Sequence, residues 1–232
     1  MANLIQLKML EDLSGFLLVD KPEGIAFATV MKTVKRKFNL VKVGHGGSLD
    51  TMASGLMVLL IGDANKFAER VMGADRVYEG RLRFGGTTDT GDIHGRPLAA
   101  AGASLLPADV DGFFAPFRGD VFQTEPRFAA IRREGAAEYE VVDTGEHSQF
   151  LSHVYRIRGQ SDGASEISFS VSCTRSFLPR AMAVESATTL TALRRTAIGK
   201  FSVANAVPFA RILETEMRDF AALVMPLSEA LQ

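Results

Sequence analysis

The chain has 232 residues, of which 47% are hydrophobic, so it can bury a substantial core and is not a largely disordered protein. Its formal net charge of −1 gives no overall attraction to nucleic acid, and any RNA or DNA contact must come from a local basic patch. No apolar run approaches the roughly 20 residues of a membrane helix, the N-terminus has no secretion signal, and the single cysteine, Cys173, excludes an internal disulfide, so we expect a cytoplasmic protein.

The first 40 residues predict a strand, a loop and an amphipathic helix. The apolar run at 16–19 indicates a strand, which ends at the Pro and Gly of 20–24. Apolar residues then recur at the spacing of one helix face, namely Phe27, Met31, Val34 and Phe38. The basic residues Lys32, Lys35 and Arg36 therefore lie off the buried face of this helix, and Lys37 and Lys42 follow them along the chain. They are either a solvated surface or a surface that follows phosphate groups, and charge alone favours the solvated one.

The segment 44–55 is rich in glycine and carries one acidic residue, Asp50, just ahead of the apolar run 56–61. Glycines allow positive φ and a close approach to a ligand, and a buried strand behind the loop aims its carboxylate. This pattern predicts a catalytic loop with Asp50 as its first candidate. An Asp beside Gly and Ser is also a common turn-capping residue, and His45 is either a structural hydrogen-bonding group or a ligand contact. The loop lacks the P-loop pattern and the serine-hydrolase elbow.

Two segments that alternate between apolar and polar residues predict half-buried strands. The run 56–61 first predicts a buried strand, and Asp63 is placed to cap a helix over 64–72. The segment 76–84 then alternates so that Tyr78 points inward. The segment 166–173 has the same period and places Cys173 in the core.

The remaining segments are less regular. Residues 99–103 read as a linker of small side chains, and 120–152 is polar, charged and weakly periodic, which indicates an insertion. The segment 193–231 is expected to add one strand and one helix. Asp89, Asp92 and His94 lie in a Thr- and Gly-rich segment that fits a turn or, less readily, a divalent metal site.

A series of short motifs runs in order along most of the chain. Residues 15–24 read G-F-L-L-V-D-K-P-E-G, 42–50 read K-V-G-H-G-G-S-L-D, and 75–79 read D-R-V-Y-E. T-T-D-T-G-D at 87–92 and L-R-R-T-A-I-G-K-F at 193–201 follow. In this order they resemble the bacterial tRNA pseudouridine synthase B (TruB) family.

The resemblance implies an α+β pseudouridine synthase catalytic fold with a mixed, mostly antiparallel sheet flanked by helices. We expect a single catalytic domain over 1–232 with an RNA-contacting insertion at about 120–152. The implied reaction isomerises a uridine in the T loop of tRNA, normally at position 55, to pseudouridine. The expected partner is the T arm of tRNA; the protein is expected to be a monomer and to need neither a metal nor an organic cofactor.

The resemblance also implies roles for individual residues. Asp50 is the essential carboxylate, Arg180 pairs with it and keeps it ionised, and Tyr78 stacks on the flipped base and provides the route for the C5 proton. The basic helix flank is then expected to contact phosphates rather than only solvent. The residues expected to bind substrate are His45, Lys21, Gly47, Ser48, Lys35, Arg36, Arg127 and Arg132.

The chain departs from the family pattern in one important segment. Residues 176–180 read S-F-L-P-R, where the family has G-T-Y-I-R. The chain is also expected to lack the C-terminal RNA-binding domain of many members. Two alternatives therefore stand beside the T-loop assignment: the same chemistry on another RNA, or an RNA-binding module that has lost catalysis.

Overall fold

The computed structural model describes residues 12–98, 105–124, 128–133, 136–141, 149–163, 165–174 and 178–230, with side chains described outside 123–150. The chain divides into two compact units, one formed by Met1–Ala74 with Arg194–Gln232 and the other by Asp75–Leu193. Its main sheet mixes parallel and antiparallel pairs, with antiparallel pairs in the majority. The predicted α+β class with a mixed, mostly antiparallel sheet is confirmed.

The first unit is built around strand β1 (Gly15–Lys21), which pairs antiparallel with β3 (Ser54–Ile61) along its whole length. The long strand β10 (Thr189–Ile198) enters this unit with its last residues and pairs parallel with β3. The other strands are short: β2 (Val43–His45), β11 (Phe201–Ser202), β12 (Val207–Pro208) and β13 (Met225–Pro226). The helices are α2 (Phe27–Lys37), α3 (Ala68–Met72), α6 (Phe209–Glu214), α7 (Leu227–Ala230), and the 3-10 helices η1 (Gly62–Phe67), η3 (Val203–Asn205) and η4 (Met217–Leu223).

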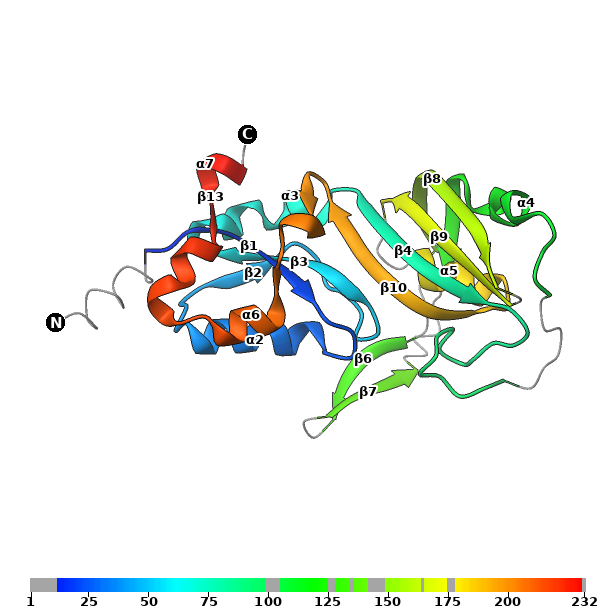
Figure 1. The fold of residues 1–232 in the computed structure, drawn as a ribbon, viewed down its shortest axis with the longest axis horizontal. Helices are drawn as coiled ribbons and strands as arrows, with labels where there is room; N and C mark the ends of the chain where they lie inside the picture. The colour runs from blue at the N-terminus through cyan, green and yellow to red at the C-terminus, as the bar shows by residue number, and fades with distance from the viewer. Residues whose placement is uncertain are drawn as a thin grey trace. The chain divides into compact units, whose positions relative to one another are not determined.

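The core of the first unit lies on both faces of β1 and β3, because nearly every residue of these strands is buried. On one face, Phe16 packs with Phe67 and Phe201. On the other, α2 buries Val30 and Val34, and Phe38 stacks on Phe220 with 3.8 Å between ring centroids. Figure 1 shows α2 and α6 along one side of these strands and α3 and α7 along the other. The predicted amphipathic helix is confirmed.

Two predictions for this unit were wrong in detail. The segment 64–72 is not one helix capped by Asp63: it is η1 followed by α3, and the carboxylate of Asp63 pairs with Lys66 at 3.3 Å instead. The C-terminal segment holds more than one strand and one helix, because its two-residue strands are defined by pairing with β1 and β10 rather than by a periodic pattern.

The second unit contains an antiparallel array in the order β4, β9, β8, β5, next to β10. Its strands are β4 (Arg76–Arg83), β9 (Glu166–Cys173), β8 (Gln149–Asp162) and β5 (Gly119–Thr124). Its helices are α4 (Val110–Phe114), η2 (Ala115–Phe117) and α5 (Leu178–Glu185). The predicted alternation of β4 and β9 is confirmed: Tyr78 and Cys173 are buried, while Glu79 is exposed.

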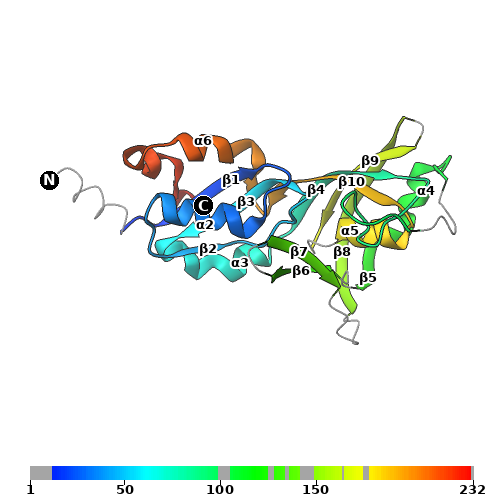
Figure 2. The same ribbon diagram turned by 90° about the horizontal axis from the view of Figure 1, so that it is seen from below.

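The segment predicted as an insertion begins and ends in the sheet, since Gly119–Thr124 pairs antiparallel with the first residues of β8. Between them, β6 (Phe128–Arg133) and β7 (Ala136–Val141) form a separate two-stranded sheet, visible side by side in Figure 2. The predicted linker at 99–103 lies outside the described residues. Along the described part of the chain, no helix is long and apolar enough to cross a membrane.

Candidate active site

The glycine-rich segment leaves β2 and returns to β3 as a loop held closely against the core of the first unit. Gly46 donates its N–H to the carbonyl of Val58 at 2.9 Å, and a Cβ at Gly46 would lie 2.2 Å from the side chain of Val71. Gly55, where the loop joins β3, has φ +104°, and a Cβ there would lie 2.2 Å from the carbonyl oxygen of Arg195. Glycine is required at both positions because any side chain would collide with a neighbouring strand or helix.

A buried guanidinium, that of Arg195, fixes the backbone of this loop. It donates to the carbonyls of Ser48 at 2.7 Å, Gly47 at 3.2 Å and Leu56 at 2.8 Å. The side chain is fully buried, so its charge depends on these acceptors. Arg195 thereby positions the loop residues on both sides of Asp50 from strand β10.

Asp50 itself is half-buried, and its Oδ1 accepts a hydrogen bond from the N–H of Met52 at 3.3 Å. Its carbonyl accepts from the N–H of Ala53 at 3.1 Å. The turn-capping contact considered from the sequence is thus present. This hydrogen bond orients the carboxylate. Asp50 can still take part in catalysis, because the other acceptor positions of its carboxylate are not used by this bond.

Lys21 ties the end of β1 to this loop. Its buried Nζ donates to the carbonyls of Pro22 at 2.9 Å, Ile25 at 2.8 Å and Thr51 at 3.2 Å. Gly24 donates its N–H to the same Thr51 carbonyl at 2.8 Å. Burial lowers the pKa of Lys21 to about 8, although the neighbouring carboxylates of Asp50 and Glu23 act to raise it. Lys21 is therefore a support for the loop and a source of positive charge near Asp50.

His45 lies at the start of the loop, with its ring edge-on to Phe27 and 4.7 Å between centroids. Its Nδ1 accepts the N–H of Gly47 at 3.2 Å, so a neutral ring carries its proton on Nε2. Burial lowers the pKa of His45, and the charge of Arg195 lowers it further. The imidazole is thus a neutral group that shapes the Gly46–Gly47 turn.

The second unit holds Arg180 in a buried ion pair. Arg180 lies in α5, and its Nη1 is 2.6 Å from Oδ2 of Asp92 and donates to the carbonyl of Thr90 at 2.6 Å. The other carboxylate oxygen of Asp92 accepts from the N–H of His94 and from the hydroxyl of Thr90, both at 2.8 Å. A buried pair of this kind is stable when its remaining donors and acceptors are also satisfied.

These contacts explain the acidic segment that also suggested a metal site. The carboxylate of Asp89 accepts a hydrogen bond from the N–H of Arg96 at 2.7 Å. One oxygen of Asp92 pairs with Arg180, and the other accepts hydrogen bonds from Thr90 and His94. In the residues that the structure describes, no three His, Cys, Asp or Glu side chains gather as a metal cluster. The turn interpretation of this segment accounts for its Asp and Thr residues.

The structure groups some predicted site residues and leaves others apart. In the first unit, the loop and its support bring together Asp50, His45, Gly47, Ser48 and Lys21. On α2, Lys35 and Arg36 are exposed, while Lys37 lies over the ring of Phe38 at 5.4 Å.

Other predicted site residues belong to the second unit or lie outside the description. Tyr78 and Arg180 are in the second unit, and Tyr78 is buried. The predicted pairing of Arg180 with Asp50 stays a prediction. Arg127 lies outside the described residues, as does the side chain of Arg132.

Comparison with known proteins identifies the family of this arrangement. The TruB family pseudouridylate synthase (N-terminal domain) matches residues 35–177. A protein from Azoarcus sp. (strain BH72) named tRNA pseudouridine synthase B is 35% identical over 202 residues, covering 83% of this chain and 67% of the relative. A protein of the same name from Aromatoleum aromaticum is 31% identical over 222 residues, covering 92% of this chain and 72% of the relative. The chain thus spans about two thirds of the length of these relatives.

Solved structures show the same fold. A chain in the crystal structure of a Cbf5–Nop10–Gar1 complex matches with a TM-score of 0.67 at 19% identity, covering 97% of this chain and 63% of that chain. A chain of the archaeal box H/ACA sRNP Nop10–Cbf5 complex matches with a TM-score of 0.64, also at 19% identity, covering 95% of this chain and 62% of that chain. At this identity the likeness shows the fold alone, and the predicted pseudouridine synthase fold is confirmed.

We predict that Arg195→Met destabilises the protein far more than the same change at its neighbour Arg194. Arg195→Met keeps an apolar stem but removes the donors to three carbonyls, and each such charged hydrogen bond contributes about 1.5–3 kcal/mol. Arg194 is partly exposed and pairs with Asp20 at 2.8 Å, a contact that contributes at most about 1 kcal/mol. Urea unfolding of both variants measures the difference. Equal losses in the free energy of unfolding would contradict the role given to Arg195.

We also predict that Lys21 makes the stability depend on pH in a defined interval. The pKa of Lys21 falls from 10.5 in the unfolded chain to about 8 in the folded protein. Between these values the unfolded chain holds a proton that the folded protein has lost, so the free energy of unfolding rises with pH. Relative to Lys21→Met, the wild-type protein should therefore gain stability from about pH 8 to 10.5 in urea titrations. Lys32→Met, at an exposed position, is the control, and parallel curves for wild type and Lys21→Met would contradict the assignment.

Proposed function

We propose that this chain, which belongs to the TruB family of pseudouridylate synthases, isomerises a uridine in the T loop of tRNA to pseudouridine with Asp50 as its essential carboxylate. The names of its relatives support tRNA as the substrate. The observation that carries the role of Asp50 is its position on a loop whose backbone is held on both sides by the buried Arg195. Such support keeps a carboxylate in place for chemistry.

The reaction requires one bond to break and one to form without loss of the base. The bond between C1′ and N1 of the uridine breaks, the uracil turns, and C1′ joins C5. The proton at C5 is then removed and N1 gains a proton, so no water or co-reactant is consumed. Asp50 serves either as the nucleophile at C1′ or as the group that assists formation of a glycal, because its carboxylate suits both. A uracil anion leaves without the second carboxylate that a glycosidase uses.

The surroundings of Asp50 provide a nearby positive charge and a hydrogen bond that orients its carboxylate. The positive charge of Lys21 lies close enough to Asp50 for the two opposite charges to attract each other. The N–H of Met52 holds one carboxylate oxygen. The charge of Lys21 and the hydrogen bond from Met52 are already present before the substrate binds, so the carboxylate needs little reorganisation during the reaction.

We assign Tyr78 and Arg180 to the same reaction on the family motif. In this proposal the ring of Tyr78, which lies on β4, stacks on the extruded uracil. The ion pair with Asp92 holds the Arg180 guanidinium rigidly, which suits a group that has to meet a carboxylate at a defined geometry. In this proposal one catalytic domain over 1–232, with an RNA-contacting segment at about 120–152, acts as a monomer in the cytoplasm.

The substrate-binding residues form the remaining part of the proposal. His45, Gly47 and Ser48 belong to the Asp50 loop and would meet the extruded nucleotide, while Lys21 would hold the loop toward it. Lys35 and Arg36 lie exposed on α2 and would contact phosphates. Arg127 and Arg132 are assigned the same role from the sequence alone.

A second candidate is pseudouridine synthesis on another RNA. It is favoured by the S-F-L-P-R sequence at 176–180, where the family pattern differs just before Arg180. The intact Asp50 and Tyr78 argue against a binding module without catalysis.

We predict that Asp50→Asn abolishes tritium release from 5-tritiated uridine in a T-arm transcript, because the amide is neither a nucleophile nor a base. Asp63→Asn is the matched control, since Asp63 is exposed and its carboxylate pairs with Lys66. A transcript without the target uridine reports background. Release that survives Asp50→Asn would refute the catalytic assignment, and release only from other RNAs would favour the second candidate.

We predict that Lys35→Ala with Arg36→Ala lowers the salt dependence of RNA binding. Each lost phosphate contact should reduce the slope of log K against log salt by about 0.9. Fluorescence anisotropy of a labelled T arm between low and moderate salt measures it. Lys66→Ala provides a control on an unrelated surface. An unchanged slope would identify the α2 lysine and arginine as ordinary solvated residues.

A further inference from the structure

The array β4, β9, β8, β5 of the second unit has one covered face and one open face. On the covered face, Phe114 from α4 lies against Gly159 and near Phe169, and α5 packs against β4 and β5. Tyr78, Ile157 and Val171 point to this side and are buried. Since neighbouring residues of a strand point to opposite faces, Val77, Ser172 and Ser170 belong to the open face, away from Tyr78.

Aromatic and large apolar side chains are exposed on the open face. Phe122 of β5 is the direct cross-strand partner of Leu151 in β8, and their exposed fractions are 69% and 46%. Farther along β8, Tyr155 is 55% exposed, and a bulge between Val154 and Arg156 places Arg156 on the same face beside it. Its ring meets that of His153 edge-on at 4.6 Å.

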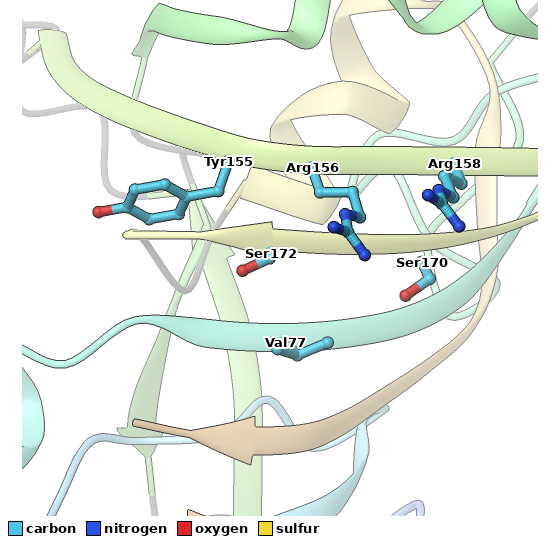
Figure 3. A pocket seen from close by; sticks show the side chains of 6 residues that line it. All are labelled: Val77, Tyr155, Arg156, Arg158, Ser170 and Ser172. Carbon is cyan, nitrogen blue, oxygen red and sulfur yellow. The ribbon is translucent and has the colours of Figure 1, made fainter. Parts of the chain in front are cut away.

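Two arginines and two serines continue this surface, which we call the open-face site. Arg156 pairs with Ser172 and Arg158 with Ser170 across β8 and β9. With Val77 and Tyr155 they line a pocket of about 410 Å³, and Figure 3 shows both arginine side chains extending from β8 toward β9, which carries the two serines. Arg and Ser side chains at this spacing are donors suited to phosphate oxygens.

The charges around the open-face site leave these two arginines available. Arg81 and Arg83, farther along β4, are neutralised by Asp162 at 3.1 Å and Glu166 at 3.0 Å. Among the residues that the structure describes, no acidic side chain pairs with Arg156 or Arg158.

Three acidic groups border the same face: Glu79, Asp75 and Asp120, whose carboxylate contacts Nδ1 of His153 at 2.5 Å. Glu79 is the cross-strand partner of Ser170 on the side away from Arg158, and Asp75 bonds to the hydroxyl of Tyr155. The positive charge is therefore concentrated over β8.

We propose that the open-face site binds an unpaired stretch of the RNA substrate, with Arg156 and Arg158 on its phosphates and Tyr155 and Phe122 stacked on its bases. This inference rests on the proposed function for its ligand, since it takes an RNA to be the substrate. The segment from Leu151 to Arg158 spans roughly 23 Å, enough for several nucleotides. Exposed aromatic side chains on an antiparallel sheet with helices behind it are the means by which proteins stack single-stranded bases.

The chemistry of the site favours single-stranded RNA over a duplex or a protein. A duplex keeps its bases stacked on each other and offers no face to Tyr155 and Phe122. Arg156 and Arg158, which have no acidic partner among the described residues, repel a basic partner and attract a polyanion. The RNA segment bound here is distinct from the flipped uridine, because the open face is opposite to Tyr78.

The direct test is binding of a fluorescein-labelled single-stranded RNA of about 8 nucleotides to the full chain and its variants, measured by anisotropy at several salt concentrations. Tyr155→Ala and Phe122→Ala should each weaken binding about tenfold. Arg156→Ala with Arg158→Ala should lower the slope of log K against log salt by about 1.4. Arg83→Gln, on the same face but ion-paired, is the matched control and should leave affinity and slope unchanged.

The outcomes separate this inference from the proposed function. Binding by Asp50→Asn at wild-type strength, together with the losses above, supports the open-face site even if no tritium is released from the T arm. Wild-type affinity and slope in all the open-face variants would overturn it, whatever the tritium assay shows. Equal loss in the Arg83→Gln control would also overturn it, because the effect would then be one of general charge. Circular dichroism of each variant confirms that the exposed substitutions leave the fold intact.

Discussion

The contact on which the first unit depends is the buried guanidinium of Arg195 with the carbonyls of Gly47, Ser48 and Leu56. A glycine-rich loop has little tendency to hold one conformation, because glycine loses more backbone freedom on folding than any other residue. Arg195 compensates for this by binding the loop from β10, a strand that pairs with β3. Arg195 thus positions the catalytic candidate Asp50 by holding the backbone of its loop.

Each unit contains a buried arginine whose hydrogen-bond partners fix a local geometry. In the first unit, a buried arginine is satisfied by backbone carbonyls, and the loop is what gains order. In the second unit, Arg180 donates to a carboxylate, that of Asp92, and to a backbone carbonyl. The carboxylate of Asp92 also accepts hydrogen bonds from Thr90 and His94 of the surrounding loop. Burying a charge is unfavourable unless every donor is used, so both arginines specify a local geometry and tolerate few alternatives.

Much of this arrangement could be predicted from the sequence, for identifiable reasons. Alternation along 76–84 and 166–173 places Tyr78 and Cys173 inside, because a half-buried strand has a strict period of two. The spacing of Val34 and Phe38 likewise identifies α2. The proposed catalytic role of Asp50 rests on its glycine-rich surroundings and on the ordered motifs. These signals depend only on residues close together in the chain, so one sequence is enough to detect them.

The supports of the site are harder to predict because their partners are backbone atoms far away. Arg195 has one sequence signal: it shares a strand face with the buried Leu193, and a charge at such a position needs partners. Nothing in the sequence shows that these are the carbonyls of residues 47, 48 and 56. Asp92 was considered for a turn or a metal, and its pairing with Arg180 had no local signature. The strand at 119–124 and the start of β8 at 149–152 have weak alternation, so the sequence does not predict them.

The pairing of Gly55 with Arg195 has a consequence for how the protein is made. The two residues lie side by side in parallel strands, and the contact from Arg195 to Leu56 spans 139 positions of sequence. Contacts of such long separation form late, because a large loop must close before they contribute any stability. On a ribosome, the Asp50 loop is synthesised early but remains without its support until most of the chain has emerged. The nascent protein is therefore expected to order its Asp50 loop only after the strands between β3 and β10 have been synthesised.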